Sequence, residues 1–79
     1  MILEFYEEGK EKCNKVHELL AKFPDTQVYR INVKEDKNLP LIDLLAVCVT
    51  PTLVFLPSLH TLCDNISRVD LIKAINKFQ

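Results

Sequence analysis

The sequence lacks most of the features that mark specialised classes of protein. Its 79 residues include a single glycine, Gly9, and no repeat or low-complexity segment, so nothing in it resembles an interdomain linker. The longest apolar run is far too short to span a membrane, and the N-terminal residues do not have the pattern of a signal peptide. We therefore expect one domain over residues 1–79, a cytoplasmic location and no membrane partner.

An excess of charge of one sign is also missing. Ten lysines and arginines stand against eleven aspartates and glutamates, which gives a net charge of −1. Lysines and glutamates alternate between Glu7 and Lys12, so no face is expected to be strongly basic. This balance argues against nucleic acid as the main partner.

Cysteines are few, and they stand alone at Cys13, Cys48 and Cys63. An odd number without a secretion signal does not indicate a disulfide framework. No pair has the spacing of a zinc site, and only His17 and His60 could add ligands. We expect neither a metal nor another cofactor.

Apolar periodicity divides the chain into seven segments. Alternating or continuous apolar residues indicate strands, whereas apolar residues three and four apart indicate helices. Thr52–Leu56 is apolar on both faces and is expected to be the central strand, and the short helix after Pro40 is expected to be mostly buried. The expected strands are Ile2–Tyr6, Gln27–Val33, Thr52–Leu56 and His60–Cys63, and the expected helices are Glu11–Lys22, Pro40–Val47 and Arg68–Phe78, the last capped by Ser67 with Asp70.

This order, β-α-β-α-β-β-α, predicts the arrangement of the sheet. The β-α-β opening implies a right-handed crossover and a parallel pair of strands, and the closing hairpin adds antiparallel strands. The expected fold class is therefore α/β, with a four-stranded mixed sheet flanked by three helices. The exposed edge strand at Gln27–Val33 or His60–Cys63 can pair between copies, so an oligomer is open to this chain.

A Thr-Pro dipeptide stands directly before the expected central strand. Proline has no backbone N–H, so it is tolerated at the first residue of a strand but not in the middle. A cis peptide bond costs little before proline and usually marks a tight turn. Thr50-Pro51 is therefore expected to form a sharp cis turn, and such a kink can present backbone atoms to a partner.

The order of elements and this proline together resemble the thioredoxin fold. Phe5 to Cys13 is similar to that family's first strand, loop and helix, and Thr50 to Phe55 is similar to its cis-proline loop and central strand. The redox members carry Cys-x-x-Cys where this chain has Lys10-Glu11-Lys12-Cys13. A dithiol cycle needs two sulfurs within bonding reach, so these two positions cannot perform it.

Four short motifs also resemble the KaiB-type clock proteins, which are thioredoxin-like without a Cys-x-x-Cys. The middle of this chain is shorter than in those proteins. The resemblance implies a partner-binding module, with a switch of fold as a further property of that family. The motifs are Tyr6-Glu7-Glu8-Gly9, Thr50-Pro51-Thr52-Leu53, Leu56-Pro57 and Asp64-Asn65-Ile66-Ser67.

Cys13 has two interpretations. A helix N-terminus and the neighbouring Lys10 and Lys12 favour a reactive thiolate, although nearby glutamates oppose this. Its place on the apolar stripe with Val16 favours a buried packing role instead. Cys48 lies three residues before Pro51, and in the thioredoxin fold that places it near the first helix, where a disulfide with Cys13 is conceivable.

Two hypotheses of different classes follow. The first is a non-catalytic, protein-binding module, in which Tyr6, Gly9, Lys10, Thr50 and Pro51 hold another protein or an extended peptide segment. The second is an atypical thiol-disulfide oxidoreductase that uses Cys13 alone or together with Cys48. Because the attacking cysteine is replaced, the binding module is favoured over the enzyme.

Overall fold

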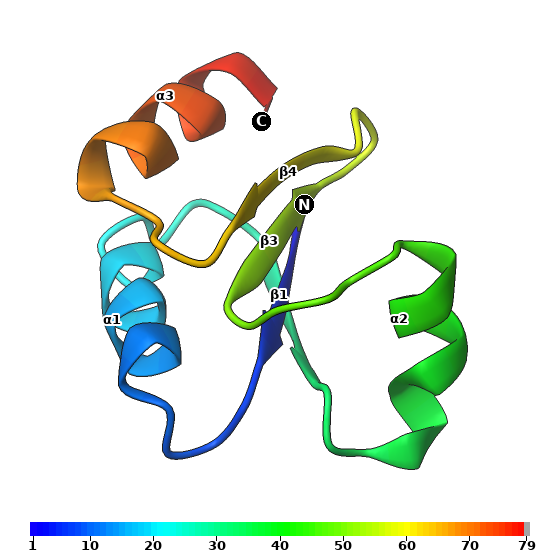
Figure 1. Cartoon of the computed structure of the whole chain (residues 1–79). Coiled ribbons are helices and arrows are strands. Elements are labelled where there is room, and N and C mark those ends of the chain that lie inside the picture. The colour runs from blue at the N-terminus through cyan, green and yellow to red at the C-terminus, as the bar shows by residue number, and fades with distance from the viewer. Residues whose placement is uncertain (79) are drawn as a thin grey trace.

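The computed structural model describes residues 1–78 and shows an α/β fold with a four-stranded sheet (Figure 1). The first strand, the last strand and the last helix have the expected bounds, whereas the second strand is two residues shorter than expected, the third is one residue shorter, and the first two helices differ at their ends. The elements in chain order are β1 (Ile2–Tyr6), α1 (Glu11–Leu20), β2 (Val28–Asn32), a 3-10 turn (Asp36–Asn38), α2 (Leu39–Leu44), β3 (Thr52–Phe55), β4 (His60–Cys63) and α3 (Arg68–Phe78).

The sheet is mixed, with the strand order β2-β1-β3-β4. β1 runs parallel to β2 and antiparallel to β3, and β3 pairs with β4 in an antiparallel hairpin. All four residues of β3 are buried, which confirms that it is a central strand. The edges are β2 and β4, as the sequence indicates.

Helices cover both faces of this sheet, with α1 and α3 on one face and α2 on the other (Figure 1). Because successive residues of a strand point to opposite faces, Ile2 packs under α1 and α3 whereas Leu3 packs under α2. The first core also holds Val16, Leu20, Leu53, Phe55, Leu71 and Ala74, and the second holds Phe5, Ile31 and Val54.

The α2 region corrects the expectation of a mostly buried helix from Pro40 to Val47. The helix spans only Leu39–Leu44, has no buried residue, and leaves Leu44 79% exposed. Six residues make fewer than two turns, so only one narrow stripe can reach the sheet. That stripe consists of Leu41, Ile42 and Leu45, which pack on the second core.

The end of α2 is a Schellman motif built without glycine. Val47 N donates to Ile42 O at 3.0 Å, and Ala46 N donates to Asp43 O at 3.2 Å. Ala46 has a φ of 53°, the left-handed conformation that the motif requires after a helix. An alanine side chain is strained in that conformation, and glycine is not.

Replacing Ala46 with glycine should therefore stabilise the protein, by about 1 kcal/mol. The same substitution at Ala21 should destabilise it by about 0.5 kcal/mol, because that residue ends α1 in the ordinary right-handed conformation. Urea unfolding followed by circular dichroism measures both. A loss of stability in Ala46→Gly equal to that in Ala21→Gly would contradict the assignment.

The other helix that differs is α1, which ends at Leu20 instead of Lys22. The chain continues in a tighter turn, in which Lys22 N donates to Leu19 O and Phe23 N donates to Leu20 O. Such three-residue hydrogen bonds are common where a helix ends. At α3 the expected cap is present, since Asp70 N donates to Ser67 Oγ at 3.1 Å.

A buried carboxylate lies in the middle of β1. Glu4 is fully buried, and its Oε1 contacts Arg30 Nε at 3.2 Å and His17 Nδ1 at 3.3 Å. Its Oε2 has no hydrogen-bond partner within residues 1–78. Burying a charge is costly unless it is paired, so Glu4 depends on the two side chains that contact it.

Removing the Arg30 side chain should show how much the buried Glu4 carboxylate depends on it. Breaking a buried ion pair costs roughly 3–5 kcal/mol, and because Arg30 is 37% exposed we expect about 2 kcal/mol for Arg30→Met. Arg68→Met, at an exposed arginine of α3, serves as the control and should change stability by less than about 0.5 kcal/mol. Equal unfolding free energies for the two variants would show that Arg30 does not compensate Glu4.

Candidate functional site

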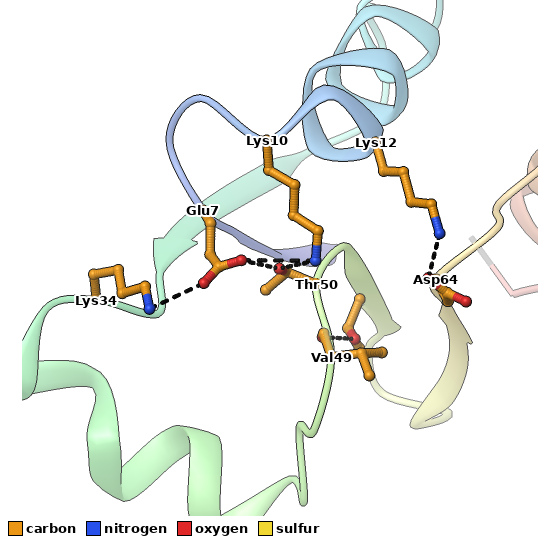
Figure 2. Close-up of polar contacts among 8 residues, drawn as sticks. Glu7, Lys10, Lys12, Lys34, Val49, Thr50 and Asp64 are labelled. Atoms are coloured by element: carbon orange, nitrogen blue, oxygen red, sulfur yellow. Dashed lines mark hydrogen bonds and ion pairs between the residues drawn. The ribbon is translucent and has the colours of Figure 1, made fainter.

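Three segments that are remote in sequence meet beside Thr50 (Figure 2). Thr50 precedes β3 and is 5% exposed. Its hydroxyl donates a hydrogen bond to Glu7 Oε2 at 2.9 Å and accepts one from Lys10 Nζ at 3.0 Å. Glu7 Oε1 also pairs with Lys34 Nζ at 3.2 Å, which adds the segment after β2. We call Glu7, Lys10, Lys34 and Thr50 the Thr50 cluster.

The other members of the Thr50 cluster lower the pKa of the Glu7 carboxyl. The hydrogen bond from Thr50 lowers the pKa of the Glu7 carboxyl below its ordinary value, and the contacts with Lys34 and Lys10 lower it further. A carboxyl with a lowered folded-state pKa stabilises the fold above its unfolded pKa, and this contribution is lost as the pH falls through the folded pKa. Glu7 is therefore ionised at neutral pH, and its contacts are those of a carboxylate.

Local backbone geometry brings Lys10 back toward Glu7. Gly9 has a φ of 77°, a left-handed conformation that costs glycine little, and Lys10 N donates to Glu7 O at 3.4 Å. Lys10 is the N-cap of α1, and its side chain makes no capping hydrogen bond. The ammonium group instead reaches across to Thr50.

The segment from Val47 to Pro51 crosses from α2 to β3 (Figure 1). The Thr50–Pro51 peptide bond is cis, and so is Leu56–Pro57. Thr52 Oγ1 donates to Val49 O at 2.6 Å, and Asp64 N donates to Pro51 O at 2.9 Å. Cys48 and Val49 are exposed, and their backbone N–H groups make no hydrogen bond within residues 1–78.

A cavity of about 310 Å³ lies between this segment and α2. Its walls are mostly aliphatic, and its polar rim belongs to the Thr50 cluster and to Cys48. No strand residue within residues 1–78 lines it, and its walls come from α2 and from the segments that follow β1, β2 and α2. The aliphatic residues that line it are Val33, Leu39, Ile42, Val47 and Val49.

The structure brings together some of the residues singled out from the sequence. Lys10 contacts Thr50, Gly9 forms the turn beside them, and Pro51 is buried directly after Thr50. Tyr6 is apart from the cavity, and the guanidinium of Arg30 covers its ring at 3.9 Å from the ring centre.

Sequence reasoning did not anticipate the role of Glu7, the contact with Lys34 or the aliphatic cavity. The spacing of three between Glu7 and Lys10 indicates a possible ion pair, and this pair is present at 3.6 Å. Nothing in the local sequence indicates the two longer-range contacts of Glu7. A second ion pair, between Lys12 and Asp64, joins the first turn of α1 to the end of β4 (Figure 2).

The three cysteines are free, and they differ in exposure. Cys13 is 1% exposed and packs among the buried residues of α1, whereas Cys48 and Cys63 are exposed. A thiol that attacks a disulfide has to be reached by its partner, so the burial of Cys13 favours the packing interpretation.

Comparison with family models, with curated proteins and with solved structures gives no match. Within residues 1–78, histidine, cysteine, aspartate and glutamate side chains do not gather in groups that could hold a metal ion. No helix in the same range has both the length and the apolar character needed to cross a bilayer. The argument for function therefore rests on the geometry of the Thr50 cluster and its cavity.

Thiol titration should separate the cysteines by their exposure. Ellman's reagent should label Cys48 and Cys63 rapidly in the native protein, and Cys13 only when denaturant is added. Cys13→Ser should remove the labelling that requires denaturant and leave the rapid labelling of Cys48 and Cys63 unchanged. Fast labelling of all three thiols in the native protein would contradict the burial of Cys13.

Proposed function

We propose that this protein is a thioredoxin-like binding module that holds an extended segment of another protein. The docking surface consists of the Thr50 cluster, the exposed residues Cys48 and Val49, and the aliphatic cavity beside them. In this proposal the chain keeps the architecture of a thioredoxin-like site and does not exchange disulfides. The resemblance to the KaiB-type proteins supports the same class of function, since it also implies partner binding.

The fold supports this proposal at the level of topology. The order β-α-β-α-β-β-α, the mixed sheet β2-β1-β3-β4 and a proline directly before a central strand are the features that the resemblance predicts. A fold can serve many functions, so the choice among them depends on the site itself.

The observation that carries the proposal is the position of the Lys10 ammonium. By the resemblance, Lys10 corresponds to the attacking cysteine of the redox members, and its ammonium is bound to Thr50 at 3.0 Å and lies 3.6 Å from Glu7. Disulfide exchange needs a thiolate that attacks the disulfide and a second sulfur that leaves as a thiolate, and an ammonium group can do neither. Cys13, the remaining sulfur of that stretch, is buried.

The cavity and the open backbone indicate what the surface holds. A volume of about 310 Å³ is at the lower end of ligand pockets, which span roughly 300–1,000 Å³, and it suits one or two aliphatic or aromatic side chains. An unpaired N–H group, at Cys48 or at Val49, can bond to the backbone of an extended peptide. An extended peptide with an apolar side chain satisfies both features.

Selection from a library of random dodecapeptides displayed on phage tests this proposal. Peptides selected on the wild-type protein should carry an apolar anchor and should shift the NMR signals of Val47 to Pro51. Val49→Asp should weaken their binding at least about tenfold, because it puts a charge at an apolar contact. Val69→Asp is the matched control, since this exposed valine of α3 lies on the opposite face of the sheet (Figure 1).

The binding module fails if no peptide is selected, and two further results would also overturn it. One is a set of selected peptides that bind Val49→Asp as well as they bind the wild type. The other is reduction of insulin disulfides with a measurable turnover that disappears in Cys13→Ser, which would support the oxidoreductase instead.

A further inference from the structure

Glu7 joins parts of the docking surface that the chain itself keeps far apart. Its partners are three, 27 and 43 positions away in the sequence, at Lys10, Lys34 and Thr50. Both carboxylate oxygens are used, Oε1 by Lys34 and Oε2 by Thr50 and Lys10. One side chain therefore connects the loop before α1, the segment after β2 and the segment before β3.

Besides the contacts of Glu7, Lys10 Nζ donates to Thr50 Oγ1, and Val33 N after β2 donates to Tyr6 O at the end of β1. The segment before β3 is tied to α2 by Val47 N and to the end of β4 by Pro51 O. Within residues 1–78, its hydrogen bonds to the loop before α1 all involve Thr50 Oγ1, which contacts Glu7 and Lys10. Without the carboxylate, the hydroxyl would lose its acceptor and two ammonium groups would lie near each other without a counter-charge.

We propose that Glu7 is a positioning residue of the docking surface, which fixes the segment from Val47 to Pro51 against the start of α1 in the conformation that a partner peptide recognises. This proposal rests on the proposed binding function. Glu7 does not itself need to touch the peptide. Its effect passes through Thr50, whose neighbours Cys48 and Val49 carry the open N–H groups.

The charged groups around Glu7 fix the expected pH dependence. Lys10 faces it from the start of α1 and Lys34 from the segment after β2, while Glu8 is exposed and makes no hydrogen bond or ion pair within residues 1–78. Cys48 lines the aliphatic cavity to which Glu7 also contributes. The lowered pKa of Glu7 agrees with this arrangement, so the connection should persist from neutral to mildly acidic pH and fail as the pH falls through that pKa.

A peptide selected on the wild-type protein is the first probe. Glu7→Gln keeps the shape and one acceptor but removes the charge that holds two lysines. It should lower the affinity for the peptide about tenfold, as measured by isothermal titration calorimetry. Glu8→Gln, which removes the neighbouring charge, should leave the affinity roughly unchanged. Equal affinities for the wild type and Glu7→Gln would overturn the positioning role.

NMR provides a second measurement that needs no peptide. The side-chain carboxyl carbon of Glu7 and the backbone amide of Thr50 should titrate together, and the Thr50 transition should vanish in Glu7→Gln and persist in Glu8→Gln. A Thr50 amide that does not follow Glu7 would overturn the proposal. If no peptide is selected, the binding function fails, and this titration still decides whether Glu7 positions the segment.

Substitutions at Thr50 keep the test valid if Glu7→Gln does not fold. Thr50→Val removes the hydroxyl at nearly constant volume, whereas Thr50→Ser retains it. Thr50→Val should abolish the coupled titration and weaken peptide binding. Thr50→Ser should retain both the coupled titration and the peptide affinity of the wild type. Identical behaviour of the two variants would show that the hydroxyl does not transmit the effect of Glu7.

Discussion

Burial of β1 and β3 on both faces is the constraint on which the rest of the structure depends. The two strands pair in the centre of the sheet, and their apolar side chains alternate between two cores. One face receives two full helices, and the other receives only the six residues of α2. The second face therefore has less helical cover than the first within residues 1–78. The aliphatic cavity beside Val49 lies at the edge of this layer, between α2 and the segments that follow β1, β2 and α2.

The same architecture explains why a charged cluster can occupy this position. The turn at Gly9 and the bend before β3 lie near each other because β1 and β3 pair at Phe5 and Thr52. With a sulfur at position 10, such a junction could host thiol chemistry. With Lys10, Glu7 and Thr50 it is a network of charge-assisted hydrogen bonds, which stabilises one conformation of the loops.

Much of the fold was predictable because it depends on local pattern. The strands β1 and β4 and the helix α3 were predicted with the bounds that the structure has, since each has a clear period and a turn or cap at its end. The end of α2 was not, because a left-handed alanine at position 46 replaces the glycine that usually marks such an end. The contact between Lys10 and Thr50 follows from the fold, whereas the choice of Glu7 as its third member depends on tertiary geometry that no local spacing encodes.

Two glutamates of the first strand and its loop show how the surroundings of a carboxylate decide its role. Glu4 is fully buried and uses one oxygen for both of its partners, while the other has no hydrogen-bond partner within residues 1–78. Its burial therefore lowers stability, and the contacts with Arg30 and His17 offset part of that loss. Glu7 is partly exposed, uses both oxygens, and contacts side chains from the start of α1, the segment after β2 and the segment before β3. Because Glu7 is partly in contact with solvent, its desolvation cost is small. Because it joins several segments, its contacts affect how those segments lie relative to one another. A partly exposed carboxylate is therefore better suited than a buried one to set the shape of a docking surface.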